Sequence, residues 1–166
     1  RQNADINGVV AYQRFLEKHT LRLSDDAAKI QFLEEHIPRL QGMLENNYSL
    51  RADYYLQTLK SNYFSITGDY EACKKTILAL LKLVSENKAL LNRQRMATPY
   101  LQLGLLEMKF QKYQEAIDAL DKCRSYLNPK NVGHFRASII KMYAYIYLKD
   151  YAQLDNLVEE LRKSSN

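Results

Sequence analysis

Residues 100–120 read YLQLGLLEMKFQKYQEAIDAL, and this stretch decides the fold. Apolar residues recur at intervals of three and four on both sides of a short polar junction, which is the pattern of two amphipathic helices. A junction of a few residues cannot reach elsewhere, so the two helices must lie side by side and antiparallel. Gly104 and Ala116 are small where the helices of such a hairpin cross closely, and Tyr100 and Tyr113 fill the space beside the crossing.

Helical periodicity continues outward from this stretch toward both ends of the chain. Short polar or glycine-containing junctions separate the periodic segments, and β-branched residues are scattered singly rather than alternating as in strands. We expect Ser24-Asp25-Asp26 to cap the second helix, Pro38 to kink it, and Gly68 to end the third in the left-handed conformation. The sequence predicts an all-α protein of about eight helices, at about residues 6–22, 24–46, 49–66, 70–86, 92–110, 113–127, 132–148 and 151–162.

The composition is that of a globular protein with few helix breakers. The 166 residues include 13 tyrosines but only 5 glycines and 3 prolines, and the net charge is +5. The excess charge lies mostly in residues 51–100, and elsewhere bases alternate with acids, as on a solvated helix face rather than a phosphate-binding stripe. The longest apolar runs, at residues 77–81 and 137–140, fall far short of the roughly 20 residues that cross a bilayer. We therefore expect no membrane insertion.

The sequence contains few residues that indicate metal binding, redox chemistry or phosphate binding. Cys73 and Cys123 lie in helical apolar patterns, where each is expected as a buried free thiol. The three histidines are isolated, and the glycines are too few and scattered for a phosphate-cradling loop. We predict a protein that is not an enzyme and holds no metal or cofactor.

Since the chain begins at Arg1 without a methionine, we also expect a piece of a longer protein. We expect it to be cytoplasmic by default.

Three junctions along the chain resemble one another. They read ITGDY at residues 66–70, KFQKY at 109–113 and YLKDY at 147–151. Each places a tyrosine at the start of the next helix, and these tyrosines, Tyr70, Tyr113 and Tyr151, are 43 and then 38 residues apart. That period is in the range of repeats built from helical pairs.

The middle unit resembles a tetratricopeptide repeat. The likeness rests on Tyr100, on Leu103-Gly104 three residues later, on Tyr113-Gln114-Glu115-Ala116, and on Leu120, Cys123 and Asn128 at the later signature spacings. Glu107, where the family usually has tyrosine, and Pro129, one residue late, depart from the pattern. The resemblance covers roughly residues 50–166 and implies antiparallel hairpins stacked as a short right-handed superhelix, an α-solenoid. We expect a single domain at residues 1–166, with a divergent helical pair at 1–48 and repeat-like pairs at 49–87, 92–128 and 132–164.

The resemblance also implies a binding surface. Members of the family usually hold partners on the concave face lined by the first helix of each pair, which suggests a scaffold that binds a peptide or a partner helix. A mixture of tyrosines with polar and basic side chains suits an extended peptide. The family's positions fall here on nine residues: Tyr55, Thr58, Asn62, Leu101, Leu105, Lys109, Arg136, Tyr143 and Tyr147.

Several alternatives remain open from the sequence. The tyrosines and leucines of the nine residues would equally serve to pack against a neighbouring helix or a second copy of the chain. The pI of about 9.1 and the many tyrosines suit a helical-repeat nucleic-acid binder, although the basic residues are too sparse for a continuous track. A ligand-sensing regulatory domain is a third possibility. The apolar side of residues 151–162 lacks a polar capping helix after it, so a homodimer through an open end is also possible.

Overall fold

The protein's structure, a computed structural model, describes residues 6–20 and 22–165. Within these residues the chain forms eight α-helices and one short 3₁₀ helix, which confirms the prediction of an all-α protein of about eight helices. Contacts run mainly between successive helices, as in stacked helical hairpins. The helices are α1 (Ile6–Thr20), α2 (Asp26–Asn46), α3 (Leu50–Thr67), α4 (Tyr70–Glu86), η1 (Lys88–Leu90), α5 (Arg93–Lys109), α6 (Tyr113–Tyr126), α7 (Val132–Leu148) and α8 (Tyr151–Ser165).

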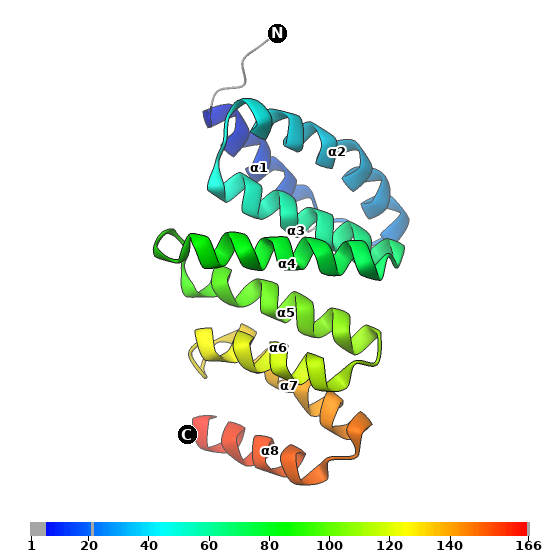
Figure 1. Cartoon of the computed structure of the whole chain (residues 1–166), viewed down its shortest axis with the longest axis vertical. Helices are drawn as coiled ribbons and strands as arrows, with labels where there is room; N and C mark the ends of the chain where they lie inside the picture. Colours follow the sequence, from blue (N-terminus) through cyan, green and yellow to red (C-terminus); the bar gives the residue numbers. More distant parts are fainter. Residues whose placement is uncertain (1–5, 21, 166) are drawn as a thin grey trace. The chain divides into compact units, whose positions relative to one another are not determined.

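The contacts divide the chain into two compact units. Unit 1 extends to Leu80 and contains α1, α2, α3 and the first part of α4. Unit 2 begins at Leu81 and contains the end of α4, η1, α5, α6, α7 and α8. Figure 1 shows the helices of each unit in chain order, coloured from blue through green to red.

Capping side chains explain where several helices begin. Asp25, Ser49, Asn92 and Asn131 each precede a helix in an extended conformation, and each accepts a hydrogen bond from a backbone N–H in its first turn. Such caps satisfy amide groups that the helix itself leaves unpaired. Asp25 is one of the three residues that the sequence suggested for the cap of α2. The helix then continues through Pro38.

Most helix ends lie within two residues of the predicted ones. The first helix ends at Thr20 rather than at residue 22, and α8 continues three residues beyond the predicted end at residue 162. The 3₁₀ helix Lys88–Leu90 was not predicted, because three residues are too few to show a periodicity.

The three similar junctions share one backbone geometry. Gly68, Gln111 and Lys149 all take the left-handed conformation, with φ of 82°, 60° and 58°. In each junction the next residue's N–H bonds to the carbonyl oxygen five residues earlier: Asp69 to Phe64 at 3.0 Å, Lys112 to Glu107 at 2.9 Å, and Asp150 to Tyr145 at 2.9 Å. This is the Schellman arrangement that closes a helix end. The prediction for Gly68 is confirmed, and the same ending occurs at two positions without glycine.

The core of unit 1 lies where α1, α2 and α3 meet. Its buried side chains are aliphatic, and half-buried aromatic rings such as Tyr12 and Phe32 pack against them. Figure 1 shows α2 and α3 lying alongside each other in this unit, and α1 contacts both. The buried residues of this core are Val9, Leu16, Leu33, Leu40, Ala52, Leu56 and Leu59.

The core of unit 2 depends on a close crossing of α5 and α6. Gly104 is buried in α5, and a Cβ atom at this position would lie only 2.7 Å from Cγ of Leu120 in α6. Leu120 is itself fully buried and packs with Ala97, Cys123 and Ala137. The prediction that Gly104 lies where the two helices cross closely is confirmed. Any side chain larger than hydrogen at residue 104 forces the two helices apart or displaces Leu120.

The corresponding crossing in unit 1 uses Ser61 and Cys73. Both residues are buried, and the Cys73 thiol donates a hydrogen bond to the Ser61 carbonyl oxygen, with Sγ and O separated by 3.3 Å. Cys123 is the second cysteine, and burial raises the pKa of its thiol to about 11. Both cysteines are free and buried, as predicted, and Cys123 stays protonated at neutral pH.

Substituting Gly104 tests the crossing directly. We expect Gly104→Ala to lower the free energy of unfolding by about 1–3 kcal/mol, the usual effect of adding a methyl group to a well-packed core. Gly42→Ala is the matched control, because Gly42 lies in α2 with nothing within 4 Å of an added Cβ. That variant should be neutral or more stable by about 0.5–1 kcal/mol, since alanine favours a helix. Urea unfolding followed by far-UV circular dichroism measures both, and equal effects would contradict the close crossing.

Candidate functional site

Helix α7 exposes a continuous row of apolar side chains. Val132, Phe135, Ile139, Tyr143 and Ile146 follow one another at intervals of three and four residues, and Tyr147 ends the row. Their exposed fractions lie between 36 and 82%. We call these six residues the α7 stripe. Intervals of three and four place side chains on one side of a helix, so the stripe runs almost the whole length of α7.

The opposite side of α7 forms part of the core of unit 2. Its buried residues include Ala137, Ser138, Ala144 and Tyr145. Helix α7 is therefore apolar on both sides, although only one side is covered. A surface helix normally carries polar side chains on its outer face, so the α7 stripe calls for a functional explanation.

The predicted residues of α7 lie on its exposed surface. Tyr143 and Tyr147 belong to the α7 stripe and are 55 and 60% exposed. Arg136 is also exposed, beside Phe135. The ring of Tyr147 stacks on that of Tyr113 in α6, with the centroids 4.9 Å apart and the planes 9° apart. That stacking holds one face of the Tyr147 ring while the rest of the side chain stays accessible.

The predicted residues of α5 differ in exposure. Leu101 is half-buried and packs against the cluster of Ala97, Leu120, Cys123 and Ala137. Leu105 and Lys109 are exposed, at the middle and the end of α5. Helix α5 contacts α7 directly, so both helices contribute to the surface of unit 2. Leu101 thus serves in packing, the alternative that the sequence left open.

The three predicted residues of α3 belong to unit 1 and are all half-buried. Tyr55 packs against the core formed by α1, α2 and α3, and burial raises the pKa of its hydroxyl to about 12. The Thr58 hydroxyl donates to the Tyr54 carbonyl oxygen in its own helix at 2.9 Å. Asn62 lies one turn further along α3. In this unit α1 contacts α3, and Tyr55 contributes to packing.

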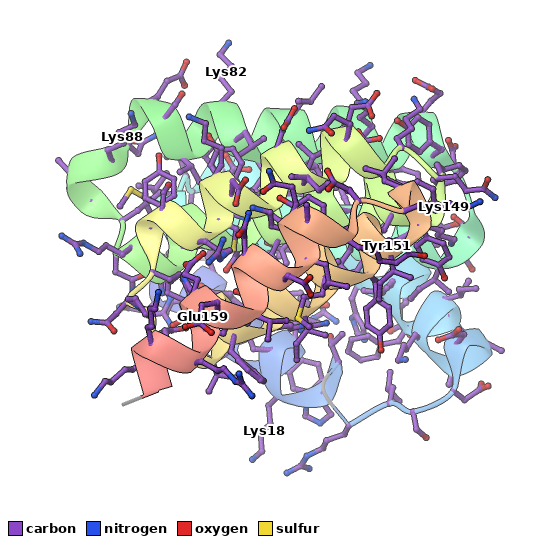
Figure 2. The ribbon with its side chains drawn as sticks, turned by 90° about the horizontal axis from the view of Figure 1, so that it is seen from below. Lys18, Lys82, Lys88, Lys149, Tyr151 and Glu159 are labelled. Atoms are coloured by element: carbon purple, nitrogen blue, oxygen red, sulfur yellow. The ribbon has the colours of Figure 1, made fainter. Side chains whose placement is uncertain are left out.

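A groove between α7 and α8 extends the apolar surface. Its volume is about 760 Å³, and its apolar walls are Phe135, Ile139 and Met142 from α7 with Val158 and Leu161 from α8. Glu159, Arg162 and Lys163 form the polar rim. Figure 2 shows α8 with Tyr151 and Glu159 labelled, about two turns apart along the helix. The sequence did not single out Phe135, Ile139 or this groove, although the apolar run at residues 137–140 was a partial signal.

A buried polar cluster joins α8 to the rest of unit 2. Arg124 of α6 is buried and forms an ion pair with Glu160 of α8. Lys141 of α7 is also buried, and its Nζ atom lies 2.7 and 2.9 Å from the two carboxylate oxygens of Asp121 in α6. The carboxylates of Glu160 and Asp121 are about half exposed, so the two basic side chains are covered while their acidic partners remain in contact with water. The Arg124–Glu160 pair joins α8 to α6, and the Lys141–Asp121 pair joins α7 to α6.

His134 lies beside this cluster with no hydrogen-bond partner at its Nδ1 atom. Burial lowers the pKa of His134 from its usual value of 6.5, the neighbouring Arg124 charge lowers it further, and Glu160 opposes the shift. The folded protein therefore keeps this imidazole neutral at a pH where the unfolded chain already binds a proton.

The described residues contain no group of three His, Cys, Asp or Glu side chains placed to hold a metal ion. Among the helices of residues 6–20 and 22–165, none is long and apolar enough to cross a membrane.

No protein-family model matches the sequence, and no curated protein matches it.

The low pKa of His134 predicts how stability changes with pH. The free energy of unfolding should be fully retained above about pH 6.5 and should fall as the pH drops below it, by up to about 1.4 kcal/mol per pH unit for this group. His134→Gln should reduce that slope, because glutamine does not titrate. Urea unfolding between pH 5 and 8 measures the difference between the two proteins. Parallel curves would show that His134 is protonated equally in the folded and unfolded states.

Proposed function

We propose that this chain is a non-catalytic protein-binding module, a tetratricopeptide-like array of helical hairpins that stack as a right-handed solenoid. Support for the architecture comes from the three junctions with one backbone geometry and from the small residues at the crossings of α3 with α4 and α5 with α6. The module needs no metal or cofactor for this role.

The α7 stripe is the observation that carries the proposal. Six exposed apolar side chains follow one another along a single helix, and contiguous exposed apolar surface often marks an interaction site. Two of them are tyrosines, the type of residue that most often anchors a protein interface. Covering this row with a partner removes it from water, which is the main driving force of protein association.

An amphipathic helix is the partner that fits the stripe. From Val132 to Tyr147 the stripe is about 22 Å long, which corresponds to roughly four turns of helix. Arg136 within α7 and Lys149 just after it are exposed. We therefore expect acidic side chains beside the apolar face of the partner helix.

Nucleic acid is the weaker alternative. The basic residues around the stripe are separated by apolar side chains rather than forming a continuous track. Lys141, a basic residue of α7, is buried against Asp121 and is not available to a phosphate.

The decisive experiment compares capture of cellular proteins by two double variants. In the stripe variant, Phe135→Ala is combined with Tyr143→Ala. In the control, Leu78→Ala is combined with Leu90→Ala, because Leu78 and Leu90 are also large, exposed apolar residues but lie outside α7. Circular dichroism first verifies that both are folded. A protein retained by wild type and control but lost from the stripe variant is then purified, and its binding to the stripe variant should be at least tenfold weaker.

Three outcomes would contradict the proposal. The first is that the stripe variant retains the same proteins as wild type. The second is that the retained material is sensitive to nuclease, and the third is that a second copy of the chain is the only partner. Sedimentation of the purified protein distinguishes the last case, since the wild type would then be a dimer and the stripe variant a monomer.

A further inference from the structure

A separate pocket lies in unit 1, between α2, α3 and the part of α4 that precedes Leu81. Its volume is about 470 Å³, within the range of sites that hold small ligands or anchoring side chains. Thr76 lines it and presents its methyl group, because its hydroxyl donates to the Ala72 carbonyl oxygen at 2.8 Å. The other apolar lining residues are Ile37, Pro38, Phe64 and Ala79.

The charges around this pocket are unequal. Lys60 and Lys75 both line it, and among the described residues neither forms an ion pair with a carboxylate. Lys60 donates to the neutral side-chain oxygen of Gln41 at 2.8 Å. Glu34 is the carboxylate among the lining residues, and it accepts a hydrogen bond from the Tyr63 hydroxyl at 3.0 Å. A ligand with a negative charge close to its apolar part would complement the two lysines.

A second hollow lies along the same two helices, α2 and α3. This hollow is about 280 Å³ and shares Gln57 and Lys60 with the pocket. Tyr48 and Leu44 line it, and Tyr48 is 62% exposed. We call the two neighbouring hollows together the unit 1 groove. Glu45 and Asp53 also line the second hollow, so the excess of basic side chains is confined to the pocket with Lys60 and Lys75. A groove with one apolar pocket and an open extension suits a linear chain better than a compact molecule.

Two glutamines in the unit 1 groove, Gln41 and Gln57, can supply one hydrogen-bond donor and one acceptor to a peptide backbone. The Gln41 side-chain oxygen accepts from Lys60, and the Gln57 side-chain nitrogen donates to Asp53 at 3.1 Å. In the part of the chain that the structure describes, no hydrogen bond engages the Gln41 nitrogen or the Gln57 oxygen. One donor and one acceptor therefore remain, as the C=O and N–H groups of an incoming backbone require.

We propose that the unit 1 groove binds a linear peptide in which an apolar side chain is followed by an acidic residue. The apolar side chain fills the pocket between Pro38, Phe64 and Ala79. The carboxylate lies between Lys60 and Lys75, and the two glutamines hold the peptide backbone. This site lies in unit 1 and uses no residue of the α7 stripe, so it stands whether or not the stripe binds a partner.

Labelled peptides test the site in the full chain. The probe is a fluorescein-labelled octapeptide with leucine followed by aspartate between glycine and serine residues, and its binding is measured by fluorescence anisotropy. We expect saturable binding that weakens at least tenfold when serine replaces the leucine or lysine replaces the aspartate (about 1.4 kcal/mol). A panel with phenylalanine or methionine at the apolar position identifies the preferred anchor.

Variants of the protein separate this site from nonspecific attraction. Lys75→Glu should weaken binding by reversing a charge, and Ala79→Phe should abolish it by filling the pocket at an exposed position that leaves the core unchanged. Lys18→Glu is the control, because Lys18 is an exposed lysine of α1 that does not line the groove. It is labelled in Figure 2. The stripe variant, Phe135→Ala with Tyr143→Ala, should bind the peptide as wild type does.

Four results would overturn the proposal. The first is that the peptide does not bind. The second is that Lys18→Glu weakens binding as much as Lys75→Glu, and the third is that Ala79→Phe binds the peptide like wild type. In the fourth case free octanoate would compete as well as an unlabelled copy of the peptide, which would mean that the pocket recognises an apolar acid rather than a chain.

Discussion

The contact of Gly104 with Leu120 is the constraint on which the rest of unit 2 depends. With no Cβ at residue 104, α5 and α6 cross closely enough for Leu120 to be fully buried against both α5 and α7. That position of α6 in turn brings Asp121 and Arg124 toward α7 and α8, where they pair with Lys141 and Glu160. One missing methyl group thus sets the spacing at which four helices can share a core and a set of ion pairs.

Most of the secondary structure could be predicted from the sequence because it depends on local patterns. Helical periodicity, the cap at Asp25 and the left-handed end at Gly68 are all encoded within a few residues. Exposure could not be predicted in the same way. Helix α7 carries apolar residues on both its covered and its exposed side, so its periodicity does not show which side is covered. Leu101 and Tyr143 also look equivalent in sequence, although only Tyr143 is largely exposed. The Arg124–Glu160 pair joins residues in different helices, and the hollows depend on the packing of several helices, which no local pattern records.

The two candidate surfaces differ in how they would recognise a partner. The α7 stripe is long and nearly continuous, so it suits another regular surface that covers it along its length. The unit 1 groove is short and hollow, with charges and amides at fixed places, so it suits a few residues of extended chain. Binding at the stripe therefore depends mainly on apolar area, whereas binding at the groove depends on the order of residues in the ligand.

The common geometry of the junctions at Gly68, Gln111 and Lys149 also limits how the chain can change in length. Each of these turns closes a helix with a hydrogen bond that spans five residues and starts the next helix at once, so an inserted residue would break the closing bond and shift the following helix. The connections around Lys88–Leu90 and residues 128–130 are exposed and form no such closure. Natural length variants, grafted loops and affinity tags placed inside the chain should accordingly be tolerated in these two connections and excluded from the three tight turns.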